Sequence, residues 1–203
     1  CNNDYFQNLK KVLSKDINPI VIFGARLPLH LSGYYFDNQE GGVEKKEWEK
    51  KYVSLGKYDN IQLSFQSELI ELQKKNKIIL IYPIPEVGWK VPGRLNSIIL
   101  KKKKKKYVYE KKINIKEYIT SSYQVYKNRT KSSFELLDSI QGDNIYRVYP
   151  HKLFCDTTIK DRCVTHDDKN IFYVDDDHPS LKGAELINDL IMKEIEKIEL
   201  KSN

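Results

Sequence analysis

The chain has 203 residues, of which 40% are hydrophobic and 31% are charged, and its formal net charge is +7. That length allows a substantial buried core, and that composition is typical of a globular protein rather than a disordered one. No apolar run approaches the roughly 20 residues that a membrane-spanning helix needs. We therefore expect one globular domain over residues 1–203.

The positive charge is concentrated in one segment. Residues 101–106 are six consecutive lysines, and without them the formal net charge falls from +7 to +1. Because like charges in a run repel one another, we expect a mobile Lys-rich loop over residues 101–112. No aromatic platform or nucleic-acid module accompanies the run, so we expect no nucleic-acid partner. A contact with an acidic surface, such as phospholipid or anionic glycan, stays open.

Hydrophobic periodicity divides the chain into helices and strands. Helices are indicated where apolar residues recur at helical spacing, and strands where short apolar runs are bounded by Gly or Pro. A long polar excursion at 27–60 separates two of these elements, and a segment of that length is usually functional or disordered. In chain order, we predict a helix at 2–16, a strand at 20–24, a helix at 61–75, a strand at 77–82, a helix at 114–140, strands at 144–149 and 170–174, and a helix at 180–198.

This alternation predicts an α/β fold. Continuous apolar strands are typical of a parallel sheet covered on both faces, and parallel connections need helical crossovers, so we expect three α/β/α layers around a mostly parallel sheet. In open sheets of this kind, ligands bind beyond the carboxyl ends of the strands. Gly24, Trp89 and His178 all follow predicted strands. We therefore expect these three residues to converge.

Of the three cysteines, Cys1 has no evident partner, whereas Cys155 and Cys163 enclose a short polar loop. A disulfide between them would close a loop of about nine residues and stabilise the fold by roughly 2.5 kcal/mol. It would also indicate an oxidising compartment such as a bacterial periplasm. The alternative is a zinc site, although the spacing matches none of the usual Cys-x-x-Cys pairs. Its ligands would be Cys155, Cys163, His166 and either His151 or His178.

The strongest chemical pattern follows the last predicted strand. Asp175, Asp176, Asp177 and His178 stand in a row before Pro-Ser opens the last helix. On a turn, the carboxylate of Asp175 can reach the imidazole three residues later and fix its tautomer, which suits a general base that activates a nucleophile. Only Asp175 has that spacing. The alternative is a surface turn whose acids complement the dipole of the helix.

The Asp175-x-x-His178 pattern resembles the fifth block of SGNH (GDSL-like) hydrolases. Four stretches, which together cover nearly the whole chain, look more closely like the periplasmic SGNH domain fused to membrane acyltransferases of acyltransferase family 3. They are 21–26 running into 31–34, then 82–89, then Tyr149-Pro150 followed by 153–156, and lastly Cys163 through Tyr173-x-Asp175-x-x-His178-Pro179-Ser180 to Gly183-Ala184.

The resemblance implies a flavodoxin-like SGNH fold with His178 as general base and Asp175 as its orienting carboxylate. Asp176 and Asp177 would be turn acids without a catalytic role. The family's oxyanion donor follows the strand that here ends at Gly24, so Gly24 and Arg26 are candidates. Many SGNH hydrolases have Gly-x-Asn-Asp at the place where this chain has Gly-Ala-Arg-Leu. Trp89 is a candidate for contact with a sugar. We expect no metal and no cofactor.

The nucleophile block of the superfamily, a Gly-Asp-Ser-type turn after the first strand, has no counterpart in this sequence. The chain also begins with Cys1 rather than Met. We therefore expect the C-terminal portion of an SGNH domain that lacks its first strand and nucleophile block, with the serine upstream of Cys1. On this expectation, the chain as given cannot turn over an ester.

Proteins of this family are implicated in O-acylation, mostly O-acetylation, of lipopolysaccharide and other surface glycans. The resemblance therefore implies a periplasmic domain of a bacterial inner-membrane protein. Its partners would be a glycan acceptor and an acyl donor supplied through a membrane acyltransferase domain. Two alternatives stay open: a carbohydrate esterase that gives the acyl group to water, and a non-catalytic glycan-binding module of the same fold.

Overall fold

The computed structural model describes residues 3–13, 15, 19–44, 60–105 and 119–201. Within these residues no helix is both long enough and apolar enough to cross a membrane. In chain order, the elements are α1 (Asn3–Leu13), β1 (Ile20–Gly24), α2 (Leu27–Ser32), α3 (Ile61–Leu72), β2 (Lys77–Ile81), α4 (Val91–Lys105), β3 (Thr120–Ser122), α5 (Tyr123–Ser139), β4 (Ile145–Val148), α6 (His151–Phe154), β5 (Arg162–Val164) and α7 (Leu181–Leu200).

The main sheet has three parallel strands in the order β1-β2-β4. Ile22 of β1 pairs with Ile79 of β2, which pairs on its other side with Tyr146 of β4. Because β2 is central and covered on both faces, its Ile78, Ile79 and Leu80 are fully buried. These strands confirm the ones predicted at 20–24, 77–82 and 144–149.

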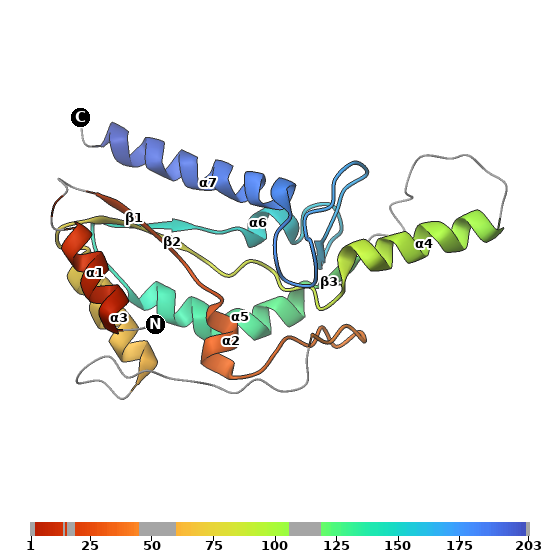
Figure 1. The fold of residues 1–203 in the computed structure, drawn as a ribbon, viewed down its shortest axis with the longest axis horizontal. Coiled ribbons are helices and arrows are strands. Elements are labelled where there is room, and N and C mark those ends of the chain that lie inside the picture. The colour runs from red at the N-terminus through yellow and green to blue at the C-terminus, as the bar shows by residue number, and fades with distance from the viewer. Residues whose placement is uncertain (1–2, 14, 16–18, 45–59, 106–118, 202–203) are drawn as a thin grey trace.

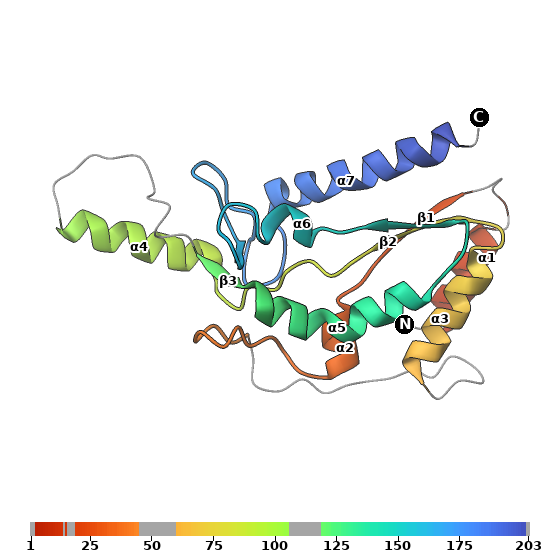
Figure 2. The ribbon, with the colours of Figure 1, turned by 180° about the vertical axis from the view of Figure 1, so that it is seen from behind.

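Helices cover both faces of this sheet (Figure 1). On one face, Ile79 and Val148 of the sheet share an apolar cluster with Ile187 and Ile191 of α7. On the other face, a second cluster joins the sheet to α3 and α5, and its members include Leu69, Ile78, Leu80, Leu137 and Ile140. The view from behind shows the same order of layers, with α7 on one side of the sheet and α1, α3 and α5 on the other (Figure 2). The predicted α/β fold class is confirmed.

The helix predicted at 114–140 is shorter than expected. Residues 114–118 lie outside the described residues, and β3 precedes α5. The hydroxyl of Ser122 accepts a hydrogen bond from the N–H of Val125 at 3.3 Å, which caps α5. β3 pairs with β5 in an antiparallel two-stranded sheet, in which Ser121 lies opposite Cys163.

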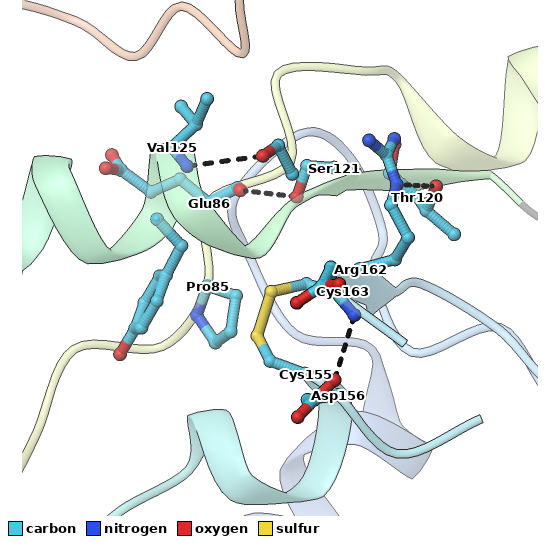
Figure 3. Close-up of a disulfide and its surroundings, with 12 residues drawn as sticks. Pro85, Glu86, Thr120, Ser121, Val125, Cys155, Asp156, Arg162 and Cys163 are labelled. Atoms are coloured by element: carbon cyan, nitrogen blue, oxygen red, sulfur yellow. Dashed lines mark hydrogen bonds between the residues drawn. A yellow bond between two sulfur atoms is a disulfide. The ribbon is translucent and has the colours of Figure 1, made fainter. Parts of the chain in front are cut away.

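A disulfide joins Cys155, directly after α6, to Cys163 in β5 (Figure 3). Both cysteines are buried. The same view shows Ser121 of β3 donating a hydrogen bond to the carbonyl of Glu86 at 3.4 Å. The disulfide predicted from the sequence is therefore present, and it ties α6 to the small sheet that leads into α5.

The disulfide contradicts the zinc alternative, because sulfurs that are joined to each other cannot serve as thiolate ligands. His166 is also engaged elsewhere. Its Nε2 accepts the N–H of Ile119 at 3.2 Å, and its Nδ1 lies 2.9 Å from the carbonyl of Asp167. His166 is thus a structural histidine that holds the segment before β3.

The strand predicted at 170–174 is wrong. The N–H of Phe172 donates to the carbonyl of Thr165, and the N–H of Ser180 donates to the carbonyl of Phe172. Only isolated bridges occur here, and none of them involves the main sheet. The apolar run is a buried loop that satisfies its backbone locally, and hydrophobic periodicity alone cannot distinguish so short a run from a strand.

The lysine run also differs from the expectation. Residues 101–105 form the end of α4 instead of belonging to a loop over 101–112, and residues 106–112 lie outside the described residues. Lysine has a high helix propensity, and α4 is anchored at its start by the buried Val91 and Leu95, so the helix continues into the run. Both views show α4 extending away from the main sheet (Figures 1 and 2).

Candidate active site

The site is built on the extended segment that follows β2. Pro83 and Pro85 lie in this segment, and the carbonyl of each accepts a hydrogen bond from a tyrosine hydroxyl at 2.8 Å, from Tyr126 of α5 and from Tyr173 respectively. Burial raises the pKa of both tyrosines, so both remain neutral donors. Proline has no N–H and so cannot donate a hydrogen bond to a neighbouring strand. The hydroxyls of Tyr126 and Tyr173 hold the segment in place instead.

The turn that carries the three acids and the histidine is docked on the same segment. The N–H groups of Val87 and Gly88 donate to the carbonyl of Asp176 at 2.9 and 3.2 Å. The N–H of Val91 donates to the carbonyl of Asp175 at 3.3 Å. The turn therefore lies beyond the carboxyl end of β2, where ligands bind in open α/β sheets.

Within the turn, Asp175 holds His178 in one orientation. Its Oδ1 accepts the backbone N–H of Asp177 at 3.0 Å and that of His178 at 2.8 Å, while its Oδ2 lies 2.8 Å from Nδ1 of the imidazole. A carboxylate only accepts hydrogen bonds, so Nδ1 carries the proton and Nε2 carries the lone pair. The spacing predicted from the sequence thus produces the expected contact.

The pKa values of this pair move apart in the directions that a base and its orienting acid need. Burial would raise the pKa of Asp175, but hydrogen bonds from the N–H groups of His178 and Asp177 and from the imidazole outweigh it and lower the pKa. The pKa of His178 is raised, first by its hydrogen bond to Asp175 and then by the charge of Asp177. The His178 side chain is 69% exposed. Within the described part of the chain, its Nε2 makes no hydrogen bond and can accept a proton from an incoming group.

Asp177 contacts the imidazole as well, which the sequence did not predict. Its Oδ1 lies 3.0 Å from Nδ1 of His178, and its Oδ2 lies 2.8 Å from Nη1 of Arg26. Only 8% of the Asp177 side chain is exposed. Burial raises its pKa to about 6, although the charges of Arg26 and His178 oppose this rise.

Arg26, which directly precedes α2, is surrounded by carboxylates. It contacts Glu44 and Glu86 in addition to Asp177. Burial lowers the pKa of Arg26, but the three carboxylates outweigh this effect and raise it. A guanidinium held in this way is a structural and electrostatic centre, so the geometry favours that role over the oxyanion role that the resemblance implies.

Glu44 reaches Arg26 because the 36–44 loop packs closely on the segment after β2. Asn38 is fully buried, donates to the carbonyl of Val87 at 3.0 Å and accepts the N–H of Gly42 at 2.8 Å. A Cβ on Gly88, whose φ is +71°, would lie 2.6 Å from the carbonyl oxygen of Gly42. Glycine is therefore required where these two backbones meet.

Gly24 and Trp89 do not join the Asp-His turn. Gly24 pairs with Ile81 at the end of β1, and a Cβ there would make only ordinary contacts with that side chain. Trp89 donates its indole N–H to the carbonyl of Thr120 at 3.3 Å, and the guanidinium of Arg94 lies 3.6 Å from its ring centroid. Among the described residues, neither hydrogen-bonds to the turn. The predicted convergence of Gly24, Trp89 and His178 is therefore not observed, and Arg26 reaches the turn instead, through its contact with Asp177.

Trp89 lines a separate open cleft of about 450 Å³. Arg162 and Glu40 form an ion pair beside it. The cleft thus combines an aromatic ring with charged groups of both signs. Its lining residues are Glu40, Trp89, Arg94, Ile98, Ile119, Thr120 and Arg162.

Together, the fold and the turn define a class of protein. An α/β protein with an Asp–His pair beyond its strand ends has the arrangement of the base half of a hydrolase-type triad. A family model described as "SGNH domain (fused to AT3 domains)" matches residues 1–193, and the chain belongs to this family. Membership indicates an acyltransferase-type role in a domain associated with membrane acyltransferases. A search of the curated proteins and a search of the solved structures found no match.

Proposed function

We propose that the chain supplies the base of an SGNH centre that transfers acyl groups, mostly acetyl groups, to hydroxyls of bacterial surface glycans such as lipopolysaccharide O-antigen. The observation that carries the proposal is the 2.8 Å contact between Asp175 Oδ2 and Nδ1 of His178, whose imidazole is exposed. The family supports the acyltransferase-type role. The glycan acceptor and the acetyl group are inferred from what the family does.

The nucleophile in this proposal is a serine from a Gly-Asp-Ser-type turn, which has no counterpart in this sequence. Among the described residues, no serine lies within hydrogen-bond distance of His178. Ser180, the nearest in sequence, instead donates its hydroxyl to the carbonyl of Ile171 at 2.6 Å and accepts the N–H of Gly183 at 3.1 Å. Its oxygen caps α7 and is not available for acyl transfer.

The mechanism follows from the tautomer that Asp175 selects. Nε2 of His178 takes the proton of the serine hydroxyl as its oxygen attacks the acyl carbonyl, and backbone N–H groups stabilise the oxyanion. The imidazolium, stabilised by Asp175, returns that proton to the leaving group, which departs and leaves an acyl-serine. Nε2 then takes the proton of a glycan hydroxyl, whose oxygen attacks the acyl-serine, and the proton finally returns to the serine oxygen.

The proposed setting is the periplasmic side of a bacterial inner membrane. The family joins this domain to AT3 domains, which would supply the acyl donor from the membrane. The Cys155–Cys163 disulfide fits an oxidising compartment. A carbohydrate esterase is the second candidate, because an imidazole that is 69% exposed admits water as readily as a sugar hydroxyl.

The test uses the full-length membrane protein in cells whose surface glycan it acylates. We expect His178→Ala to abolish glycan acylation, and Asp175→Asn to reduce it by roughly 10³- to 10⁴-fold because the neutral amide no longer selects the tautomer. Mass spectrometry of the glycan measures the acyl groups. Asp176→Asn is the matched control, since it removes a charge from the same turn and should leave acylation intact. Acylation that survives His178→Ala would show that His178 is not the base. If expression of the full-length protein removes acyl groups from the glycan instead of adding them, the protein is an esterase.

A further inference from the structure

We propose that Asp177 is a second positioning carboxylate for His178 and that Arg26 holds it in place, so that two acids orient the imidazole. The inference deepens the proposed function and rests on it for its catalytic meaning. The arrangement of Asp177, Arg26 and His178 is argued only from contacts within this chain. It also changes the role of Asp177, which the resemblance treats as a turn acid.

The carboxylates of Asp175 and Asp177 both lie close to the same ring nitrogen of His178. Asp175 Oδ2 lies 2.8 Å from Nδ1 of His178, and Asp177 Oδ1 lies 3.0 Å from it. Nδ1–H makes its hydrogen bond to Asp175, whereas Asp177 makes an ion-pair contact with the same nitrogen. The imidazole therefore has one carboxylate as its hydrogen-bond acceptor and a second carboxylate at ion-pair distance.

Two carboxylates this close repel each other unless their charges are compensated. Each of them is compensated through its other oxygen. Asp175 Oδ1 accepts two backbone N–H groups of the turn, whereas Asp177 Oδ2 pairs with Nη1 of Arg26 at 2.8 Å. Each acid therefore has one oxygen anchored and the other directed at Nδ1 of His178.

Arg26 is suited to this task because it is itself immobilised. Its Nε donates to Glu86, its Nη1 contacts Glu44 and Asp177, and its Nη2 donates to Glu44 and Glu86. Four of the five N–H groups of this guanidinium donate to Glu44 and Glu86, and Asp177 adds an ion-pair contact. Glu86, whose side chain is 6% exposed, is held in turn by Nε of Arg129 in α5 at 2.8 Å. The position of Asp177 is thus tied to β1, β2 and α5.

The charges of this network favour the imidazolium that forms during proton transfer. Two guanidinium groups face five carboxylates, because the carboxylate of Asp176 lies within 4.8 Å of those of Glu44 and Asp177, so the network carries excess negative charge near the ring. The raised pKa of His178 has Asp175 as its first cause and Asp177 as its second. The raised pKa of Asp177, about 6, means that this second carboxylate loses its charge in mildly acidic solution. The charged groups of the network are Arg26, Arg129, Glu44, Glu86, Asp175, Asp176 and Asp177.

The experiment measures the imidazole itself and uses the 203-residue chain. Long-range ¹H–¹⁵N spectra report the tautomer and the pKa of each histidine, and His178→Gln assigns the His178 signals. We expect the Nδ1–H tautomer in the wild type. Asp177→Asn should lower the pKa of His178 by about half a unit, because the lost charge lies at hydrogen-bond distance but in a partly solvated site. Asp175→Asn should lower it further, and the double variant should bring it to about 6.5.

Asp176→Asn is the matched control, because in the described structure its carboxylate does not contact the ring. If Asp177→Asn shifts the pKa of His178 no more than Asp176→Asn does, Asp177 is only a structural partner of Arg26 and the proposal is wrong. A second measurement needs no substitution. In the wild type, the titration of His178 should show an inflection where the Asp177 carboxyl carbon titrates, near pH 6, and independent titrations of the two groups would overturn the proposal.

These outcomes separate the inference from the proposed function. If His178 titrates as expected but full-length His178→Ala still acylates glycans, the positioning network is real and the catalytic role of His178 is wrong. If His178 is essential but insensitive to Asp177, only the inference fails. In full-length protein, Asp177→Asn should also move the acidic limb of the rate–pH profile to lower pH by the same half unit, because the base remains deprotonated at lower pH.

Discussion

At the scale of single residues, two histidines in this chain occupy opposite environments. His178 is exposed beside two carboxylates, and its pKa is raised. His151 is buried, its Nδ1 makes no hydrogen bond in the described part of the chain, and its pKa is lowered to about 4, chiefly by burial and then by the charge of Lys152. The rings around His151 are Tyr123, Tyr126, Phe134 and Tyr149. The surroundings of each histidine, rather than its residue type, decide its charge.

The lowered pKa of His151 predicts acid sensitivity. An unfolded chain binds the proton near pH 6.5 but the folded chain only near pH 4, so the stability that His151 contributes is complete above pH 6.5 and is lost as the pH falls towards 4. The loss should reach at most about 3 kcal/mol. Urea unfolding at pH 4.5 and pH 7 measures it. His151→Phe should remove this part of the pH dependence, whereas His30→Gln, at an exposed position, should retain it; equal pH dependence in all three proteins would contradict the assignment.

The site was only partly predictable at this scale. The contact between Asp175 and His178 followed from a local spacing, because a turn brings residues three apart together. Asp177 was missed because an acid next to the histidine has no such spacing. Its alignment depends on Arg26, which lies far away in the sequence and reaches the turn only through the sheet. No local pattern reports such a partner.

At the scale of elements, α7 is fitted closely to the loop that carries the turn. A Cβ on Gly183 would lie 2.2 Å from the carbonyl oxygen of Phe172. Gly183→Ala should therefore shift α7 or the loop and destabilise the fold by about 1–3 kcal/mol, even though alanine favours helix. Gly93→Ala in α4 is the matched control, because a Cβ there meets nothing within 4 Å, and it should be neutral or slightly stabilising. Denaturant unfolding compares the two, and equal effects would show that the contact is not tight.

The elements differ in how far the sequence predicted them. The three strands of the main sheet were predicted because continuous apolar runs report burial on both faces. The loop at 170–174 has the same apolar signal, but its backbone is satisfied by Thr165 and Ser180 instead of by a neighbouring strand. The helix α4 was missed because the charge of its lysines was weighed above their helix propensity.

At the scale of the whole molecule, the described residues offer no nucleophile to His178, the proposed base. The 203-residue chain should therefore release no acetate from an acetylated sugar beyond the rate of its His178→Ala variant. Measuring acetate release for both proteins tests this. The near-UV circular dichroism of the tyrosine side chains checks that both are folded. Acetate release that exceeds the variant and depends on His178 would show that a residue of this chain serves as the nucleophile.

The sequence by itself determined the α/β fold class and the Asp175–His178 contact and favoured the disulfide, because each depends on a periodicity or on residues close together in the chain. The tertiary structure alone decided which other groups join the turn. It brought Arg26, Glu86 and Asp177 together from the ends of β1 and β2 and from the turn itself. It also left Gly24 and Trp89 out. Parallel strands place distant residues at one edge of the sheet, but only side-chain packing at that edge determines which of them meet.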